Sequence, residues 1–487
     1  MTEPVRVGEL LPGVVDEAIA RAGPGYDRWA EQVAATGYCI HPVRLRGRVD
    51  HADPQTGEVR TVYSTDREPD ATLLKACGNR RVSVCPSCSA TYQADSFQLL
   101  AAGLRGGKGV PETVAGHPRL FVTFTAPSFG QVHSRNAQGL LVYPCHPYRQ
   151  GQRCPHGRRL GCWHRHDADD PRLGEPLCAR CYQAGAQVLW NALAGRLWSR
   201  TTIYLYRTLA QLAGLSETDL RRLVRISFAK VAEYQKRGAV HFHAIFRLDA
   251  RTACGCAACV APPPAGFTAD LLEAAVRQAA TTVTVRCPSP SDDPAGPELA
   301  AGWGKELDVR RIGADDGEEL TEEQVAGYIA KYATKSTEAL GVTLDHRIGE
   351  ADLEELDLPT HVAELVHTCW ELGSRPSLAR LRLRKWAHML GFGGHFSTKS
   401  RRYSTTLGAL RRARVAYAIR RRHGDTLPLD AWGRPADDQV VIVVATWSYI
   451  GSGYQTTGEA WLAASAAARA REARRIAKEE LRTMTAA

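Results

Sequence analysis

The sequence contains no apolar run long enough to cross a membrane. Its longest apolar stretch, Val440 to Ile450, includes a Thr and a Ser and is far shorter than the ~20 residues that a membrane helix needs. The amino-terminal residues also lack the basic-then-apolar pattern of a secretory signal. We therefore expect a cytoplasmic protein with no membrane partner.

The sequence is poor in lysine, and one long stretch has no acidic residue. Of the 62 basic residues, 52 are Arg and 10 are Lys, and there is no Asp or Glu from Leu372 to Gly424. Surfaces that serve only solubility mix both signs of charge, so this stretch favours a nucleic-acid-binding face over a merely solvated one. Its basic residues are Arg375, Arg380, Arg382, Arg384, Lys385, Lys399, Arg401, Arg402, Arg411, Arg412, Arg414, Arg420, Arg421 and Arg422.

The rest of the composition is typical of a folded protein. Of the 487 residues, 44% are hydrophobic and 23% are charged, and the net charge of +10 agrees with a polyanionic partner. The length suggests about three domains. We predict an amino-terminal region over residues 1–116, a mixed α/β domain over 117–340 with an insertion at about 145–182, and a basic carboxy-terminal region over 341–487.

Cysteine is abundant and clustered. There are 14 Cys residues, and clustered thiols in a reducing cytoplasm more often bind metal than form disulfides. Each of two clusters has one Cys-x-x-Cys pair and further cysteines upstream, which predicts a closed, structural zinc site. The first cluster comprises Cys39, Cys77, Cys85 and Cys88, and the second comprises Cys154, Cys162, Cys178 and Cys181, with His156, His164 and His166 as alternative ligands.

A third cluster is less complete. It contains Cys254, Cys256 and Cys259, and Cys287 is the remaining candidate for a fourth ligand. A surface loop of free cysteines explains this cluster equally well.

The middle of the chain predicts strands and helices in the order β-α-β-β-α-β, followed by a further helix. Alternating apolar residues indicate strands, apolar residues at helical spacing indicate helices, and Lys236, Arg237 and Gly238 form the expected turn of a hairpin. The expected elements are strand 120–125, helix 184–212, strands 222–233 and 239–248, helix 269–280, short strands 282–286 and 307–312, and helix 322–336.

Two histidines on the second hairpin strand are candidate metal ligands. His241 and His243 are two residues apart, so their imidazoles project from one face of the strand. If the turn is a three-residue loop with Gly238 in the left-handed conformation, Glu233 lies opposite His241 on that face, whereas a two-residue turn points it away. Two imidazoles and a carboxylate would hold a divalent ion and leave positions for a phosphate oxygen. A pair of half-exposed histidines without a ligand is the alternative.

A tyrosine pair lies on the helix after the last predicted strand. Tyr328 and Tyr332 are four residues apart and share a helix face, with Lys331 and Lys335 beside them. A neighbouring cation lowers the cost of a phenolate, and a metal on the phosphoryl group makes a phenol a competent nucleophile. The alternative is an aromatic pair packed on the sheet with two solvated lysines.

These segments resemble a known family. The ordered motifs FVTFTAP, HFH and YIAKYATK are similar to motifs one, two and three of the HUH endonucleases that initiate rolling-circle replication. Conjugative relaxases of that superfamily usually place the tyrosine before the histidines, whereas here it follows them. Longer segments, including AEYQKRGAVHFHAIFR and GHFSTKSRRYSTTLGALRRAR, resemble the replication initiators of actinobacterial plasmids and integrative elements. The resemblance implies an α+β fold with a central antiparallel sheet, zinc-binding insertions and a basic, mostly helical carboxy-terminal region.

The resemblance also implies a nicking enzyme that acts on origin DNA. His241 and His243 would hold Mg²⁺ or Mn²⁺. Tyr332 would attack the scissile phosphate to give a 5′-phosphotyrosine and a free 3′-hydroxyl, and Tyr328 would cleave again when the origin is regenerated. The chain has no GxxxxGK[ST] phosphate loop, so we expect a host helicase and replisome to unwind and copy the DNA.

Two other classes of protein fit part of the pattern. A zinc-stapled DNA-binding regulator without catalysis explains the charge and the cysteines, but it leaves the histidines and tyrosines without a role. An HUH transposase or mobilisation relaxase uses the same chemistry, although the motif order and the second tyrosine oppose it.

Overall fold

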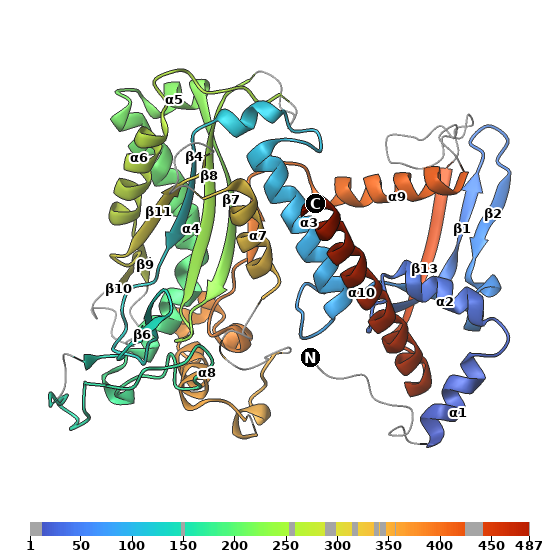
Figure 1. Cartoon of the computed structure of the whole chain (residues 1–487), viewed down its shortest axis with the longest axis horizontal. Helices are drawn as coiled ribbons and strands as arrows, with labels where there is room; N and C mark the ends of the chain where they lie inside the picture. Colours follow the sequence, from blue (N-terminus) through green and yellow to red (C-terminus); the bar gives the residue numbers. More distant parts are fainter. Residues whose placement is uncertain are drawn as a thin grey trace. The chain divides into compact units, whose positions relative to one another are not determined.

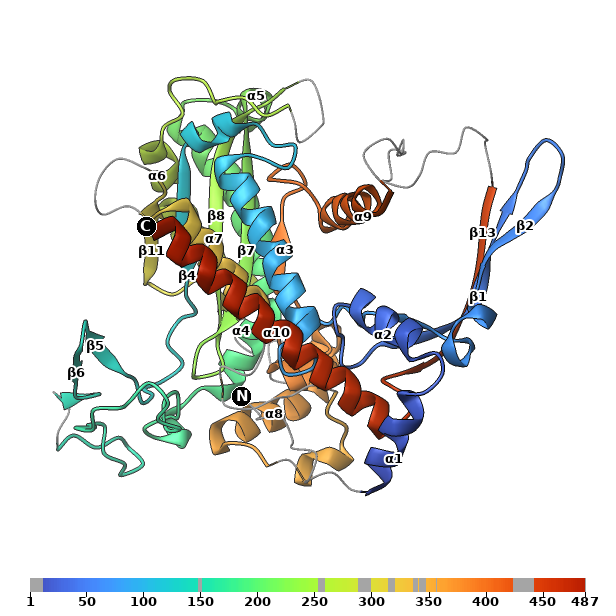
Figure 2. The same ribbon diagram turned by 45° about the vertical axis from the view of Figure 1, so that its right-hand side comes forward.

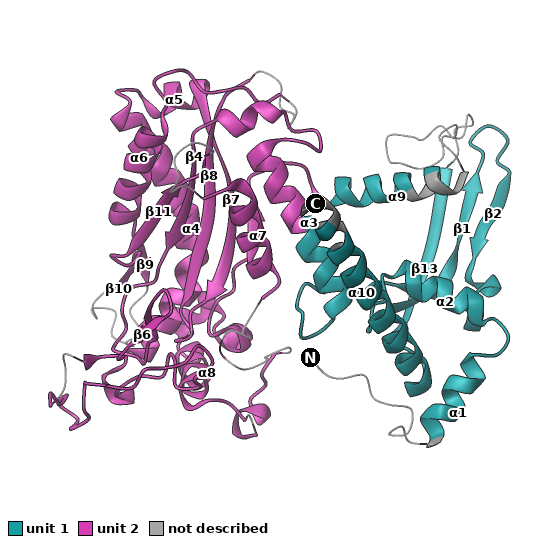
Figure 3. Cartoon of the chain, in the orientation of Figure 1, with its two compact units in different colours: residues 1–95, 407–487 teal, residues 96–406 magenta. Residues whose placement is uncertain are grey.

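The chain folds into two compact units, which Figure 3 colours separately. Unit 1 comprises residues 1–95 and 407–487, and unit 2 comprises residues 96–406. These two units do not coincide with the regions predicted from the sequence, whose boundaries lie at residues 117 and 341. Unit 1 combines both ends of the chain because a carboxy-terminal strand pairs with an amino-terminal one. The computed structural model describes residues 12–147, 151–252, 259–287, 299–313, 320–335, 340, 347–355, 357–423 and 442–486.

Unit 1 is organised around an antiparallel sheet with the strand order β13-β1-β2, in which β3 also pairs with β1. Strand β1 pairs with β13 along its whole length, and a small core contains Trp29, Val33, Leu74 and Ala463. The elements are α1 (Pro12–Arg21), α2 (Tyr26–Ala35), β1 (Val43–Ala52), β2 (Val59–Ser64), β3 (Leu73–Lys75), the first half of α3 (Pro86–Arg105), α9 (Leu407–His423), β13 (Ile442–Ser452) and α10 (Thr457–Ala486), with short 3₁₀ turns at Thr65–Arg67 and Pro69–Ala71.

Unit 2 is organised around a five-stranded antiparallel sheet with the order β11-β4-β8-β7-β12. Its strands are β4 (Arg119–Phe124), β7 (Val224–Tyr234), β8 (Val240–Ala250), β11 (Leu307–Arg311) and β12 (Ser397–Lys399), and its helices are α4 (Ala184–Leu212), α5 (Glu217–Leu223), α6 (Ala269–Thr282), α7 (Glu322–Ala333) and α8 (Thr360–Gly373). Small pairs are formed by β5 (Asn136–Gln138) with β6 (Leu141–Tyr143) and by β9 (Val285–Cys287) with β10 (Leu299–Ala301), and 3₁₀ turns lie at Glu112–Gly116, Ala179–Cys181, Ala351–Glu354, Pro376–Leu381 and Arg384–Met389.

The order of elements in unit 2 agrees with the sequence-based prediction of an α+β fold. Strand β4 is followed by α4, the β7–β8 hairpin, α6, β11 and finally α7. Helix α4 has the predicted bounds of 184 and 212, and α7 ends at Ala333, a few residues before the predicted end. Among the described helices, none is long and apolar enough to span a lipid bilayer.

The two faces of the large sheet have different coverings (Figure 1, Figure 2). On one face, Phe242 and Phe246 of β8 pack against Trp198 of α4, with ring centroids 5.9 and 5.8 Å apart. This face belongs to the main hydrophobic core, which also includes buried residues of α6 and α8. Because side chains alternate along a strand, His241 and His243 point to the other face, where α7 packs against β7.

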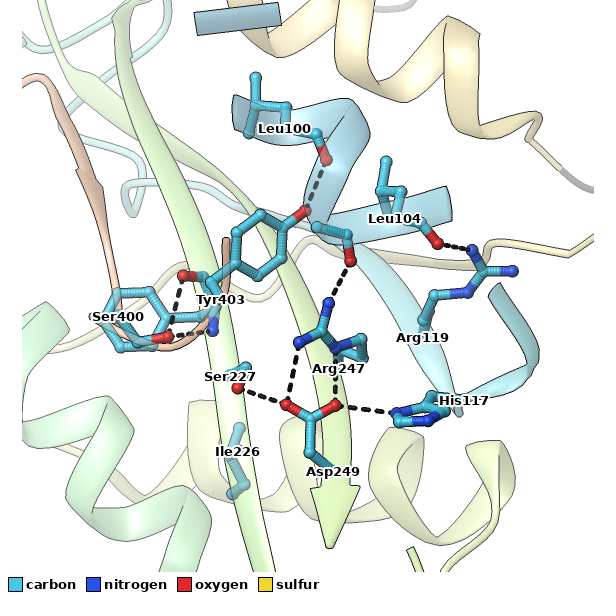
Figure 4. Close-up of polar contacts among 12 residues, drawn as sticks. Leu100, Leu104, His117, Arg119, Ile226, Ser227, Arg247, Asp249, Ser400 and Tyr403 are labelled. Atoms are coloured by element: carbon cyan, nitrogen blue, oxygen red, sulfur yellow. Dashed lines mark hydrogen bonds and ion pairs between the residues drawn. The ribbon is translucent and has the colours of Figure 1, made fainter. Parts of the chain in front are cut away.

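A buried ion-pair network lies on the same face as the histidines, at the other end of β8 (Figure 4). Arg247 Nε lies 2.6 Å from Asp249 Oδ1, and the Ser227 hydroxyl donates to Asp249 Oδ2 over 2.6 Å. His117 Nδ1 lies 2.8 Å from the same carboxylate, and Arg247 also donates to the carbonyl of Gly103 in α3. Both charged partners are fully buried, so each depends on the other for compensation of its lost hydration.

Candidate active site and metal-binding groups

The β7–β8 hairpin has the turn that brings Glu233 opposite His241. Lys236, Arg237 and Gly238 form the loop, and Gly238 has a φ of 79°. Glu233 pairs with His241 in the strand register, which matches the three-residue alternative drawn from the sequence. The left-handed conformation at Gly238 is open to glycine without strain, so this residue fixes the register of the carboxylate.

Two polar residues of α4 hold this turn in place, and neither is evident from the sequence. The Gln187 side-chain amide donates to the carbonyl oxygen of Arg237 over 2.8 Å. Asn191 donates to the carbonyl oxygen of Gly238 over 3.0 Å and accepts from the backbone N–H of Val240 over 3.1 Å. Both side chains are buried on the largely apolar inner face of α4, and a polar residue at such a helical position is the signal that could have identified them.

Glu233, His241 and His243 converge on one point. Glu233 Oε2 lies 3.1 Å from His241 Nε2 and 2.9 Å from His243 Nε2. Burial acts to raise the pKa of Glu233, but its hydrogen bonds with both imidazoles outweigh burial and hold that pKa at about 2. Burial lowers the pKa of His243 and so favours the neutral imidazole, which is the form that binds metal.

The spacing of these three groups fits a divalent cation. Adjacent ligand atoms around an octahedral ion at about 2.1 Å are about 3.0 Å apart, which matches the separations of 3.1 and 2.9 Å between Glu233 Oε2 and the two imidazole nitrogens. Two imidazoles and one carboxylate on one side of an ion leave its other side open to substrate. The side chains of His241 and Glu233 are 16% and 15% exposed, so the group is not sealed from solvent.

Strand β4 supplies two further residues to the site. The Thr123 hydroxyl lies 3.1 Å from His243 Nδ1, so that nitrogen is engaged while Nε2 faces Glu233. The Phe121 ring stacks parallel to the His243 imidazole with centroids 5.8 Å apart. Both residues lie within the motif FVTFTAP, but the sequence assigned neither a role; their alternation on one strand face was the available signal.

Helix α7 is fixed at its amino-terminal end. The Thr321 hydroxyl accepts from the backbone N–H of Gln324, and the Gln324 side chain accepts from the N–H of Thr321, which makes a capping box. Glu322 forms an ion pair with Arg119 of β4, whose guanidinium also donates to the carbonyl of Leu104 over 2.7 Å. These contacts anchor the tyrosine helix to the sheet that carries the histidines.

The two tyrosines lie beside the histidines. The Tyr328 hydroxyl is 3.5 Å from His243 Nε2, and the Tyr332 ring centroid is 5.7 Å from that of His243. Burial raises the pKa of both phenols, and the negative charge of Glu233 further raises that of Tyr332. A phenolate here therefore needs nearby positive charge.

Both predicted lysines lie near Tyr332. Lys335 Nζ is 4.9 Å from the Tyr332 ring centroid, and Lys331 Nζ is 5.9 Å from it. The structure thus brings together all seven residues that the sequence assigned to this site. They are Glu233, His241, His243, Tyr328, Lys331, Tyr332 and Lys335.

The first cysteine cluster converges as its spacing predicts. Cys77 Sγ lies 3.6 Å from Cys88 Sγ, and Cys85 Sγ lies 3.8 Å from Cys39 Sγ. Thiolates around a tetrahedral zinc ion are about 3.8 Å apart, so the four sulfur atoms have the separations of such a site. Cys39, which lies far upstream in the sequence, is close enough to complete it.

The second cluster differs from the predicted grouping and corrects it. Cys154, Cys178 and Cys181 converge with His156, whose Nδ1 atom is 3.2 Å from Cys181 Sγ, whereas Cys162 lies in another group. Spacing alone did not reveal this, because several Cys and His residues of the segment have suitable separations. Cys162 instead approaches the residues His133, Cys145 and His166.

The third cluster lies mostly outside the described residues. Cys254 and Cys256 are not described, while Cys259 is partly exposed and Cys287 is buried in β9.

The basic stretch is distributed over both units. Residues 375–402 belong to unit 2, and α9 belongs to unit 1. Some of its cations have protein partners: Lys399 donates to the carbonyl of Ser404 over 3.0 Å, and Arg414 forms an ion pair with Asp95. Others, including Arg380 and Arg411, are exposed.

Known proteins match this chain along nearly all of its length. Residues 25–468 match the RepSA family, described as "Replication initiator protein, pSAM2". A replication initiator protein of Streptomyces ambofaciens is 44% identical over 488 residues, covering 99% of this chain and 97% of that relative. No solved structure matches the chain. The chain therefore belongs to the RepSA family of replication initiator proteins.

Proposed function

We propose that this protein initiates replication by nicking one strand of origin DNA with a tyrosine nucleophile. Family membership supports the initiator role. The observation that carries the nicking step is that Tyr328 and Tyr332 lie directly beside the Glu233, His241 and His243 group. The antiparallel sheet with a tyrosine helix on its histidine face supports an HUH-type endonuclease fold.

In the proposed reaction, the hydroxyl oxygen of Tyr332 attacks the scissile phosphorus. A bond forms between this oxygen and phosphorus while the bond from phosphorus to the 3′ oxygen breaks. The phenol gives up its proton and the leaving 3′ oxygen takes one up, so the products are a 5′-phosphotyrosine and a free 3′-hydroxyl. One phosphodiester replaces another, so nicking and rejoining need no ATP.

The chain's own residues prepare this step. Lys335, close to the Tyr332 ring, stabilises the developing phenolate against the negative charge of Glu233. Thr123 fixes the orientation of His243 before substrate binds. A Mg²⁺ or Mn²⁺ ion held by the two histidines and Glu233 would polarise the scissile phosphate.

The second tyrosine gives the enzyme a means to end a round of replication. Tyr328 and Tyr332 have ring centroids 4.6 Å apart, so both hydroxyls can reach one phosphate-binding position in turn. Tyr328 cleaves the regenerated origin, and the 3′-hydroxyl released there attacks the first phosphotyrosine. This exchange closes the displaced strand and frees Tyr332.

Structural zinc and exposed basic residues complete the proposal. The Cys39 group and the Cys154 group each have the geometry of a structural zinc site. The exposed arginines among the described side chains of residues 375–420 bind the DNA backbone, and a host helicase and replisome unwind and copy the duplex.

A plasmid nicking assay tests this function. The full-length protein is incubated with Mn²⁺ and supercoiled DNA that carries the origin of the element encoding it, and a plasmid without that origin serves as control. We expect nicked circles from the origin plasmid alone. The matched double variant Tyr328→Phe with Tyr332→Phe should bind the DNA and leave it supercoiled. Binding without nicking by the wild type would instead identify a non-catalytic regulator.

A further inference from the structure

The insertion between β4 and α4 has almost no apolar core. Among the described residues from 131 to 181, the buried ones are Cys145, Cys154, His166, Gly174 and Cys178. Figure 2 shows that loops dominate this region around the short β5–β6 hairpin. Small segments without an apolar core are held by disulfides or by metal ions, and these cysteines are free thiols.

Two of the buried residues belong to a four-residue group that the sequence did not predict as a site, since Cys162 and His166 were assigned to the Cys154 cluster. The ligand atoms of His133, Cys145, Cys162 and His166 all lie within 4.8 Å of one another. His133 Nδ1 is 3.2 Å from His166 Nε2, and Cys162 Sγ is 3.6 Å from the same nitrogen. Around tetrahedral zinc, two nitrogen ligands are about 3.4 Å apart and a nitrogen and a sulfur about 3.6 Å apart. The spacing therefore fits one zinc ion.

His166 is oriented as metal-binding histidines usually are. Its side chain is fully buried, and its Nδ1 atom lies 2.7 Å from Asp170 Oδ2. An Nδ1–H that donates to this carboxylate leaves the Nε2 lone pair pointing at the other three ligands. A carboxylate that orients a histidine in this way is the usual partner of a zinc-bound imidazole.

The ligands of the two groups alternate along the chain. The order is His133 and Cys145, then Cys154 and His156, then Cys162 and His166, then Cys178 and Cys181. Each ion would therefore join two chain segments, and a ligand pair of the other ion lies between these segments in the sequence. We propose that residues 131–181 form a cross-braced module with two zinc ions, the second of which is bound by His133, Cys145, Cys162 and His166.

A competing ligand set shares His166. His164, His166 and Asp170 also converge, but that set has no thiolate and the His164 side chain is 52% exposed. Zinc prefers a closed site with thiolate ligands when its role is structural. Asp170 is also engaged by the Arg172 guanidinium over 2.9 Å, so it serves better as the orienting carboxylate.

The new site supports the candidate active site through the backbone. His133 donates its backbone N–H to the carbonyl of Glu175 over 2.8 Å and accepts from the N–H of Gly174 over 2.9 Å. Gly174 has a φ of 91° and packs so tightly on the β7–β8 turn that any Cβ atom would clash with the Lys236 carbonyl. The zinc module therefore packs directly against the turn that positions Glu233.

Zinc counting in the purified full-length chain tests this inference independently of the nicking reaction. Among the cysteine groups of the described residues, we expect three zinc ions by native mass spectrometry, one in the Cys39 group and two in the module. Cys145→Ser and Cys162→Ser should each contain one ion fewer than the wild type, whereas the control His164→Ala should contain as many as the wild type. Asp170→Asn should weaken the affinity for zinc about 10- to 100-fold, as measured by competition with a chelator.

Thiol labelling of the wild type provides a measurement that needs no variant. Cys145 and Cys162 should resist alkylation in the untreated chain and react once a chelator has removed zinc. Equal reactivity with and without the chelator, or a disulfide between them, would overturn the inference. Loss of an ion from His164→Ala together with full occupancy in Cys145→Ser would overturn it as well.

Discussion

Glu233 lies directly opposite His241 across the β7–β8 hairpin, and its Oε2 atom is 3.1 Å from His241 Nε2. This relationship depends on the length of one loop. If the same residues formed a two-residue turn, the register would shift by one and the carboxylate would point to the opposite face of the sheet, where α4 packs. The candidate metal site is therefore a consequence of the turn chemistry at Gly238 as much as of the ligands themselves.

Loss of a histidine should strongly reduce cleavage but leave DNA binding intact. His241→Ala or His243→Ala removes a ligand of the ion that polarises the phosphate, and we expect the nicking rate to fall by about 10²- to 10³-fold, equivalent to several kcal/mol of transition-state stabilisation. Binding to an origin oligonucleotide, followed by fluorescence anisotropy, should be unchanged. His367→Ala is a matched control because this histidine is exposed on α8. Full nicking by the His241 and His243 double variant would refute the assignment.

Variants of Glu233 should respond to added metal differently from the histidine variants. Glu233→Ala weakens the site without removing an imidazole, so we expect a large loss of nicking that higher Mn²⁺ partly restores. Glu233→Gln keeps the shape of the side chain and separates charge from packing. An activity equal to that of the wild type in both variants would show that the carboxylate is not a ligand.

Much of unit 2 could be predicted because its signals are local. Alternation along β8, helical spacing along α4 and α7, and the glycine in the turn each act over a few residues. The partition of cysteines between zinc groups could not be predicted, since it depends on which loops meet in space. The pairing of β1 with β13 joins residues that are about 400 positions apart, from Ala52 with Ile442 to Val43 with Ser452, and no periodic pattern encodes such a contact.

The buried Asp249 network should make unit 2 sensitive to acid. Burial acts to raise the pKa of Asp249, but hydrogen bonds from His117 and Arg247 outweigh it and lower the pKa. Because the folded pKa is below the unfolded value of about 3.9, this stabilisation is complete above that value and is lost as the pH falls through the folded pKa.

Asp249→Asn measures this contribution. The change leaves Arg247 buried without its partner, and we expect a loss of about 3–5 kcal/mol at neutral pH. In thermal unfolding monitored by tryptophan fluorescence, the gap between wild type and variant should stay nearly constant as the pH is lowered from about 6 to about 4 and should narrow below about 3.9. Asp219→Asn, which affects an exposed ion pair with Arg222, should change stability little at any pH. A gap that does not depend on pH would contradict this account.

The Cys154 group should stabilise the fold without acting in turnover. Replacement of Cys178 and Cys181 by Ser should remove one zinc ion and lower both solubility and the thermal midpoint. The fraction that remains folded should nick the origin at nearly the wild-type rate. A folded, fully stable variant that has lost nicking selectively would show that this group acts in the reaction.

The two tyrosines should differ in their roles. Tyr328→Phe removes a hydroxyl that is needed when the origin is cut a second time, so the variant should still nick origin DNA. In cells it should accumulate multimeric or unresolved single strands, which gel electrophoresis of the replicating element would reveal. Normal monomeric circles from Tyr328→Phe would indicate that one tyrosine suffices for both cuts.

The most direct test of the account is to identify the residue that becomes linked to DNA. Two origin oligonucleotides are used, one labelled on the 5′ side of the scissile phosphodiester and one labelled on its 3′ side. Each is incubated with the wild type or with Tyr332→Phe. The peptide that is covalently linked to DNA is then mapped by mass spectrometry. We predict that the 3′-side fragment is attached to Tyr332 in the wild type and that the variant, whose packing is almost unchanged, forms no adduct in the first cut. A labelled peptide that contains only Tyr328, or an equal distribution over both tyrosines, would contradict the division of labour, and the absence of any adduct while the DNA is nicked would contradict tyrosine catalysis itself.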